Sequence, residues 1–256
     1  MPQFNRSIER VGSILNLFSP SKPVWGVSEI AQELDISIVT ANNFVRTLEK
    51  IGFLDQDDNS RKYKLGTRIL GIGTVIASNL ELNQRGGALA IELSSRSGLG
   101  CRLGVWDKDA ALTIFRAEPG IRPSLGTQFG PRVVAYCTAM GRALLAYFEP
   151  SEIDLYFKNA KLISITPKTK TDPDEIMEEL EQTRNRGFSI NNEEMLLGQK
   201  TIGAPIFYKH NKVAGVICIG GEADILIDTV LDNIVKELKD TALQISCNMG
   251  YWPGSP

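Results

Sequence analysis

The strongest constraint on the fold is the pattern of residues 27–52, VSEIAQELDISIVTANNFVRTLEKIG, which is typical of two short helices joined by a tight turn. Ser28 and Ser37 each stand where a serine hydroxyl can cap a helix by satisfying amides of the first turn. Apolar residues follow both serines at steps of three and four, and Gly52 stands where a left-handed C-cap is expected. The pattern predicts a helical hairpin with one buried face.

The outward face of the second predicted helix is polar and rich in amide groups. Asparagine can bond adenine with two hydrogen bonds, and arginine can reach guanine or a phosphate, so such a face suits the major groove of DNA. An ordinary solvated face is the alternative, because polar faces are the rule on surface helices. The face consists of Ser37, Thr40, Asn42, Asn43, Arg46 and Lys50.

The segment after this helix favours the DNA interpretation. An apolar segment begins at Phe53, a turn is expected at residues 57–60, and residues 61–65 alternate as a returning strand. A basic hairpin directly after such a helix is the layout of a winged helix-turn-helix, whose wing contacts the sugar-phosphate backbone. We therefore expect residues 1–66 to bind double-stranded DNA. The candidate DNA-binding residues are Ser37, Thr40, Asn42, Asn43, Arg46, Arg61 and Lys62.

Residues 67–86 are expected to form a linker helix. Thr67 can cap it, and Ile69, Ile72, Val75, Ile76 and Leu80 form an apolar stripe. The stripe either folds back on its own chain or packs against a second copy. Residues 1–66 hold eight Lys or Arg and eight Asp or Glu, so this neutral domain should bind DNA modestly as a monomer. A helix-turn-helix reads DNA best as a symmetric pair, which favours a homodimer.

Residues 87–250 show a mixed pattern of helices and strands. Helices flanking a largely antiparallel sheet are typical of a small-molecule sensor module and place the whole chain in the α+β class. Strands are expected at residues 101–106, 111–117, 122–126, 201–208 and 213–219. Helices are expected at residues 88–95, 138–148, 151–158, 173–186 and 228–249.

Composition and motifs exclude several classes of function. The four cysteines are widely spaced without a CxxC pair, and the single histidine is His210, so no metal site is expected. The chain has no GxSxG or GxxxxGK[ST] motif, so we expect no catalytic residues and no cofactor. It also has no stretch of 18 apolar residues and no apolar core of a signal peptide near its start, which predicts a cytoplasmic protein without membrane contact.

Several segments together resemble the IclR family, the isocitrate lyase regulator family of bacterial transcription factors. Their order and spacing cover almost the whole chain. In the first domain they are RSIERVGSILNLF, the helix-turn-helix above and RKYKLGTRILGIG. In the second they are TAMGRALLAYF, ITPKTKTDPDEI, RNRGFSINNEEMLLGQKTIGAPIF and VAGVICIGG.

The resemblance implies a two-domain repressor or activator that forms a homodimer or a dimer of dimers. Its C-terminal domain would be similar to the GAF fold and would bind a small-molecule effector. The effector-contacting positions of the family fall here on Leu125, Ala139, Met140, Asn191, Thr201, Cys218 and Gly220.

The chain departs from the family pattern at both sites. The family usually has an arginine where this chain has Asn43, which leaves the operator sequence open. Met140 is bulky and apolar, Asn191 replaces an acidic residue, and Cys218 and Gly220 stand where hydroxyl groups are frequent. The departures predict a less polar pocket, suited to an aromatic or amide-bearing effector rather than a two-carbon or three-carbon acid.

Other interpretations stay open at this point. Thr138 either presents free helix amides to an anion such as a carboxylate or simply caps its helix. The chain is alternatively an enzyme acting on a small carboxylate, with the winged domain serving only for assembly. The adjacent Glu193 and Glu194 are then a candidate acid-base pair, although a structural contact explains them more simply. A scaffold that binds peptide through the wing is a further alternative, and its binding should be insensitive to salt.

Overall fold

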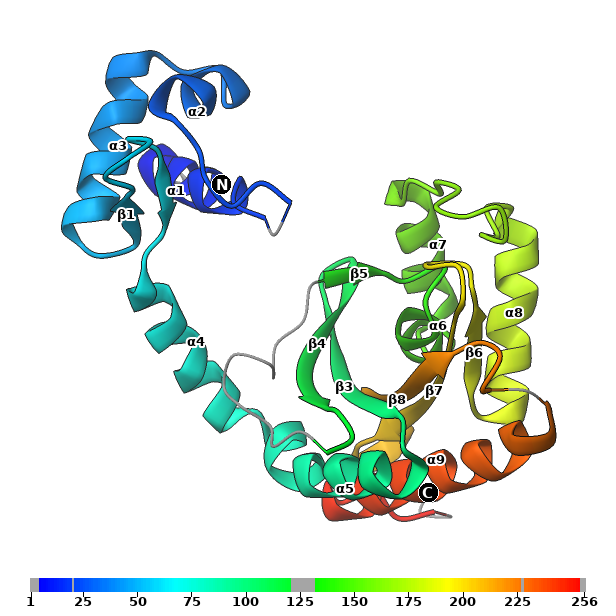
Figure 1. The fold of residues 1–256 in the computed structure, drawn as a ribbon. Helices are drawn as coiled ribbons and strands as arrows, with labels where there is room; N and C mark the ends of the chain where they lie inside the picture. The colour runs from blue at the N-terminus through cyan, green and yellow to red at the C-terminus, as the bar shows by residue number, and fades with distance from the viewer. Residues whose placement is uncertain (1–4, 20, 121–131, 227, 254–256) are drawn as a thin grey trace. The chain divides into compact units, whose positions relative to one another are not determined.

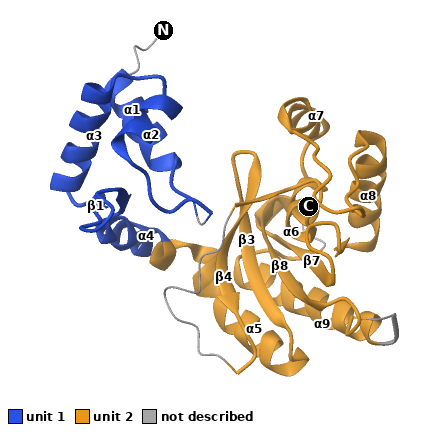
Figure 2. Cartoon of the chain, turned by 45° about the horizontal axis from the view of Figure 1, so that its top comes forward, with its two compact units in different colours: residues 1–76 blue, residues 77–256 orange. Residues whose placement is uncertain are grey.

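The chain folds into two compact units, Met1–Ile76 and Ala77–Pro256 (Figures 1 and 2). The structure is a computed structural model that describes residues 5–19, 21–120, 132–226 and 228–253. Each unit has its own hydrophobic core, and the two are described separately below. Helices and strands both contribute to each unit, which confirms the expected α+β class.

The N-terminal unit packs three helices against a short hairpin. Trp25 lies buried in its core, where the indole Nε1 donates to the carbonyl of Leu17 at 2.9 Å. Trp25 also forms an isolated antiparallel bridge with Tyr63 beside the hairpin. The unit thus has the expected winged helix-turn-helix arrangement. Its elements are α1 (Arg6–Asn16), α2 (Val27–Glu33), α3 (Ile38–Lys50), β1 (Leu54–Gln56), β2 (Tyr63–Leu65) and most of α4 (Thr67–Asn79).

The caps of the helix-turn-helix agree with the sequence at α3 but not at α2. Ser37 caps α3 as predicted, and Gly52 has a φ of 78° after its end. The predicted cap of α2 at Ser28 is wrong, because the helix already begins at Val27 with Gly26 as its N-cap. The Glu29 carboxylate accepts the amide of Gly26 at 2.7 Å, and so satisfies the amide of the N-cap residue itself.

The predicted linker helix is divided into two helices. Helix α4 ends at Asn79, and α5 (Glu81–Ser97) begins after Leu80, whose backbone is extended. Gly86 and Gly87, at the expected end of the linker helix, instead lie buried inside α5. A Cβ at Gly86 would stand 3.1 Å from Leu103, and one at Gly87 would stand 3.2 Å from Phe115. Glycine at these positions therefore allows α5 to lie close to the sheet.

The C-terminal unit is built on one six-stranded sheet of order β5-β4-β3-β8-β7-β6. Every described neighbouring pair is antiparallel, as the sequence suggested. The short strands β5 and β6 were not predicted, and the strand expected at residues 122–126 lies outside the described residues. The strands are β3 (Gly100–Asp107), β4 (Ala110–Ala117), β5 (Arg132–Val134), β6 (Ser189–Asn192), β7 (Gln199–Phe207) and β8 (Val213–Glu222).

Helices cover the two faces of the sheet differently (Figure 1). Helices α5 and α9 lie on one face, over an aliphatic core that includes Leu103, Ile217 and Ile219. Helix α6 lies against the other face, and a Cβ at Gly141 would overlap the backbone of Ala135, so only glycine fits there. The remaining elements are α6 (Ala139–Leu145), α7 (Pro150–Asn159), α8 (Pro173–Arg186), a 3₁₀ turn (Lys209–Asn211) and α9 (Asp228–Asn248).

Candidate functional site

The outward face of α3 is available for contact. Ala41, Val45 and Leu48 hold the helix to the core of its unit, because all three are buried. On the other side Asn43 and Arg46 are exposed. Within the described parts of the chain these two side chains have no hydrogen-bonding partner. Their amide and guanidinium groups are thus free to bind another molecule.

The first turn of α3 combines a polar cap with exposed aliphatic residues. The Ser37 hydroxyl accepts the Thr40 amide at 3.1 Å and contacts the Thr40 hydroxyl at 2.8 Å, so both side chains help to start the helix. Ile38 is 59% exposed and Val39 71% exposed. The sequence analysis did not select this pair, although both fall off the buried stripe. Exposed aliphatic groups suit contact with the methyl group of thymine.

The wing is fastened to α2 by one of its basic residues. Lys62 forms an ion pair with Glu29 at 3.0 Å, and both side chains are half-buried. The amide of Gly26 and the Lys62 ammonium hold the pKa of the Glu29 carboxyl below its ordinary value. Arg61 is exposed and has a φ of 57° beside the turn that Asp57 closes by accepting the amide of Ser60. Of the two predicted phosphate ligands, Arg61 is the more accessible.

The second candidate site lies on the α6 face of the C-terminal sheet. Asn191, Thr201 and Gly220 are directly opposite one another on β6, β7 and β8. Opposite residues of an antiparallel pair project from the same face, and alternate residues of a strand do so too. Cys218 therefore shares this face with the other three. The strand register joins four of the predicted effector positions.

Helix α6 adds Ala139 and Met140 to the same place. The Ala139 carbonyl accepts the hydroxyl of Ser189 at 2.6 Å, which ties the start of α6 to β6. The Met140 sulfur lies 3.8 Å from the Thr113 hydroxyl. Six of the seven predicted effector positions thus meet at one face, and Leu125 lies outside the described residues.

The cysteines near this face are neutral thiols. Burial raises the pKa of Cys218 to about 12, and the positive charge of Arg102 opposes this shift. Burial also raises the pKa of Cys137 to about 11. A thiolate is the reactive form of cysteine, so neither group is prepared for nucleophilic chemistry.

The start of α6 is capped internally. The Thr138 hydroxyl donates to the carbonyl of Val134 at 2.6 Å and accepts the amide of Gly141 at 3.1 Å. The side chain of Asn191 donates its amide to the carbonyl of Cys137 next to this cap. These contacts agree with the simpler interpretation of Thr138 as a helix cap.

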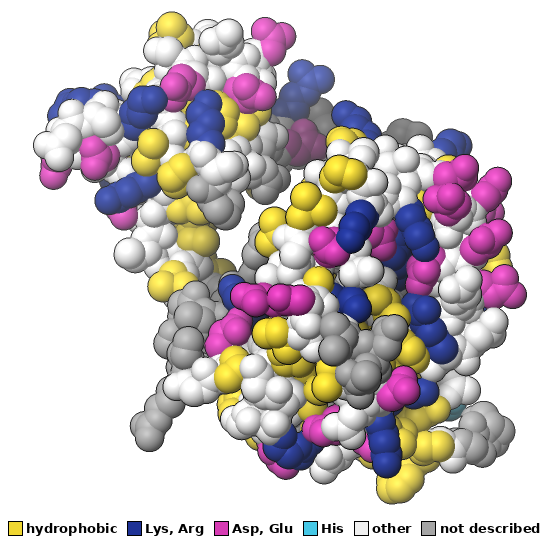
Figure 3. All heavy atoms as spheres, turned by 45° about the vertical axis from the view of Figure 1, so that its right-hand side comes forward, with side chains coloured by type: hydrophobic (Ala, Val, Ile, Leu, Met, Phe, Trp, Pro, Cys, Tyr) yellow, Lys and Arg dark blue, Asp and Glu magenta, His cyan; other side chains and the backbone are white. Residues whose placement is uncertain are grey.

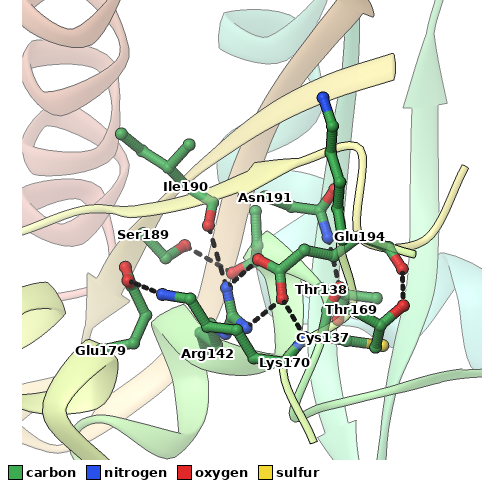
Figure 4. Close-up of polar contacts among 12 residues, drawn as sticks. Cys137, Thr138, Arg142, Thr169, Lys170, Glu179, Ser189, Ile190, Asn191 and Glu194 are labelled. Carbon is green, nitrogen blue, oxygen red and sulfur yellow. Dashed lines mark hydrogen bonds and ion pairs between the residues drawn. The ribbon is translucent and has the colours of Figure 1, made fainter. Parts of the chain in front are cut away.

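A buried ion pair between α6 and the turn after β6 lies beside the candidate effector site (Figure 4). The Arg142 guanidinium donates to both carboxylate oxygens of Glu194, at 2.5 and 2.6 Å. Arg142 is fully buried and also donates through Nε to the carbonyl of Tyr136 at 2.7 Å. The same carboxylate accepts the amide of Lys170 at 3.2 Å. Glu194 therefore has the structural role suggested for it, and Glu193 pairs separately with Lys168.

Two family models match the chain over these two units. The IclR helix-turn-helix domain matches residues 7–58, and the C-terminal domain of bacterial transcriptional regulator IclR matches residues 74–247. The second match alone spans more than half of the chain.

The chain belongs to the IclR family.

Curated relatives agree with this assignment over their full length. The HTH-type transcriptional regulator KipR of Bacillus subtilis is 30% identical, over 98% of this chain and 100% of that protein. The HTH-type transcriptional regulator XynR of Escherichia coli is 25% identical, over 96% of this chain and 98% of that protein. This IclR protein is accordingly a DNA-binding transcriptional regulator, and the enzyme alternative has no support among these relatives.

Solved structures show the same fold. An IclR transcriptional regulator from Alicyclobacillus acidocaldarius is 25% identical with a TM-score of 0.82, covering 97% of this chain and 100% of that one. An IclR homologue from Microbacterium hydrocarbonoxydans, crystallised with 4-hydroxybenzoate, is 19% identical with a TM-score of 0.79. That alignment covers 95% of this chain and 98% of the other.

Metal-binding clusters and membrane-spanning helices are two further features to consider among the residues that the structure describes. No group of three or more His, Cys, Asp or Glu side chains there is arranged to hold a metal ion. No described helix is both long enough and apolar enough to cross a membrane.

Replacing Glu194 by Gln should destabilise the C-terminal unit of this IclR regulator. The substitution keeps the shape of the side chain but leaves the Arg142 charge buried without compensation, which costs about 3 to 5 kcal/mol. Urea unfolding, followed by circular dichroism, measures the decrease in the free energy of unfolding. The control Glu193→Gln removes a pair with the more exposed Lys168 and should change stability little. Equal losses in the two variants would contradict the structural role of the buried pair.

Proposed function

We propose that this IclR regulator binds its operator as a homodimer through α3 and the wing, under the control of a small effector bound at the α6 face. The observation that supports DNA binding is the exposed polar face of α3 in a chain of this family. On this face Asn43 and Arg46 have no hydrogen-bonding partner among the described residues. A protein that regulates bacterial transcription acts on the chromosome, so we place it in the cytoplasm.

The geometry of α3 and the wing supports a division of roles. Asn42, Asn43 and Arg46 are proposed to contact base edges, because they lie on or beside the outward face of α3. Arg61 and Lys62 are proposed to contact phosphates from the wing. Ser37 and Thr40 start the helix whose N-terminus approaches the backbone of the DNA.

The exposed apolar side chains of α4 support a homodimer. Ile72 is 47% exposed, Val75 is 61% and Ile76 is 58%, and these three residues share one side of the helix. Figure 3 shows hydrophobic side chains at the surface along this helix. A contiguous apolar surface of this kind marks an interaction site in a soluble protein. A second copy of α4 is the partner that fits best, because a symmetric dimer also places two α3 helices on two half-sites of the DNA. The same contact is compatible with a dimer of dimers.

The composition of the α6 face supports an aromatic or amide-bearing effector. Met140 and Cys218 are apolar, and Thr201 and Asn191 add few polar groups. The relative from Microbacterium was crystallised with 4-hydroxybenzoate, an aromatic acid. The effector would act by favouring one of two packings of the dimer, which changes the separation of the two α3 helices. Only a difference in its affinity for the two packings can do this.

Arg46→Ala should weaken specific DNA binding. Loss of an arginine contact to a base costs about 1 to 3 kcal/mol, and binding of the wild type should weaken steeply with salt. The measurement is a mobility shift at fixed salt on fragments from upstream of the protein's own gene. The control is Arg96→Ala, at an arginine of the other unit that pairs with Glu92 and Glu237. Unchanged affinity in Arg46→Ala would remove this residue from the interface.

Introducing charge on α4 should dissociate the dimer. The double variant Ile72→Glu, Ile76→Glu places four carboxylates at the proposed interface of two copies, so the protein should sediment as a monomer and bind the operator weakly. Analytical ultracentrifugation measures the molecular mass of the protein in solution and so distinguishes monomer from dimer. Leu155→Glu is the matched control, since Leu155 is 60% exposed on α7 of the other unit. A dimer that survives the double variant would show that α4 is not the interface.

Aromatic acids should stabilise the protein against heat, and short acids should not. The proposed face offers apolar contact to a ring and few partners for a two-carbon or three-carbon acid. Thermal unfolding with 4-hydroxybenzoate, phenylacetate, pyruvate and glyoxylate at equal ionic strength compares the two groups. Stabilisation by pyruvate or glyoxylate alone would refute the proposed class of effector.

A further inference from the structure

The centre of the outward face of α3 holds an aliphatic residue, Val39. Residues that are three, four and seven positions apart share one side of a helix. Asn42, Asn43 and Arg46 stand at these distances after Val39. The valine therefore lies one helical turn before them, on the face proposed to contact bases.

Neither packing nor helix formation explains a valine at this position. Its side chain is 71% exposed, and no other large apolar side chain among the described residues is more exposed. Valine is a weaker helix former than alanine, because its branched side chain loses rotamer freedom in a helix. The start of α3 is instead stabilised by the cap at Ser37. The fold therefore does not require valine here.

The other exposed aliphatic residue of this turn lies on a different side of the helix. Ile38 is 59% exposed, but Ala41 and Val45, three and seven positions after it, are buried in the core of the unit. Ile38 therefore lies at the flank of α3, whereas Val39 lies at the centre of the outward face. The apolar surface at that centre is a single side chain, which is too small to dock another protein.

The chemistry of the outward face matches the edge of an A·T base pair. In the major groove this pair presents the thymine methyl group beside the thymine O4 acceptor and the adenine N6 and N7 groups. Val39 offers two methyl groups, and Asn43 offers an amide donor and acceptor one turn later. Cytosine has an amino group and no methyl group at its major-groove edge. A valine beside amides thus complements thymine better than cytosine.

We propose that Val39 selects a thymine in each half-site of the operator by packing against its C5 methyl group. This inference rests on the proposed function, which puts α3 in the major groove. Valine has one strongly preferred rotamer in a helix, so its methyl groups are held in place before DNA binds. Four residues of helix advance about 6 Å, and stacked base pairs are about 3.4 Å apart. The thymine therefore lies within about two base pairs of the position that Asn43 contacts.

The experiment first identifies the operator by selecting binding sequences from random double-stranded DNA with the full chain. Each thymine of the selected site is then replaced in turn by deoxyuridine, which removes the C5 methyl group and keeps the base pairing. Fluorescence anisotropy at fixed salt measures the affinities. At the thymine that Val39 contacts, the wild type should bind about fourfold more weakly for one replaced methyl group and about 15-fold for the symmetric pair.

The variant Val39→Ala tests whether this residue contacts the methyl group. It should bind the thymine and uracil operators equally, because the contact is already lost from the side of the protein. Ile38→Ala is the matched control, since it shortens an exposed aliphatic side chain of the same turn at the flank of the helix. It should keep the preference for thymine. The melting temperature of Val39→Ala should equal or exceed that of the wild type, because alanine is the better helix former.

Three results would overturn the inference: the selected half-site contains no thymine, uracil replaces every thymine without loss of affinity, or Val39→Ala keeps the preference of the wild type. The variant Arg46→Ala separates this failure from failure of the proposed function. If Arg46→Ala weakens specific binding while no preference for the methyl group depends on Val39, only this inference is wrong. If the wild type selects no sequence at all, the proposed function is contradicted as well.

Discussion

The two-sided register of β8 is the constraint on which the C-terminal unit depends. This strand pairs with β3 along one edge and β7 along the other, so the side of every residue from 216 to 220 is fixed. Ile217 and Ile219 enter the aliphatic core under α5 and α9. Cys218 and Gly220 alternate with them and face α6. A slip of one residue would bury the side chains proposed to contact the effector and expose the core.

A second constraint is the buried pair that joins α6 to the turn between β6 and β7. Two charges held this deep are weak support for stability compared with aliphatic packing, but separating them is costly. The pair thereby fixes where the start of α6 lies relative to Asn191. The proposed effector positions on α6 and on β6 are thus held together, although the two segments are far apart in the sequence. Such preorganisation lowers the entropy cost of ligand binding.

Local signals in the sequence predicted most of the N-terminal unit, because its caps and turns depend on residues a few positions apart. Ser37 and Gly52 are examples, since one caps α3 and the other ends it. The predicted helix cap at Ser28 was wrong because α2 begins one residue earlier, where the Glu29 carboxylate accepts the amide of the N-cap residue Gly26. The division at Leu80 was not predictable, since it depends on α5 packing against a distant part of the sheet. The position of Arg102 opposite Cys218 was not predictable for the same reason, since it depends on the pairing of β3 with β8.

The ion pair between the wing and α2 has a consequence for how the protein meets a polyanion. Lys62 is already neutralised by Glu29 in the free protein. If the pair persists on DNA, it adds no net charge to the interface and displaces no condensed cation. If Lys62 leaves for a phosphate, one ionic contact replaces another, and an unpaired carboxylate is left near the duplex. The wing therefore contributes all of its cations to the salt dependence of DNA binding only if Lys62 exchanges Glu29 for a phosphate.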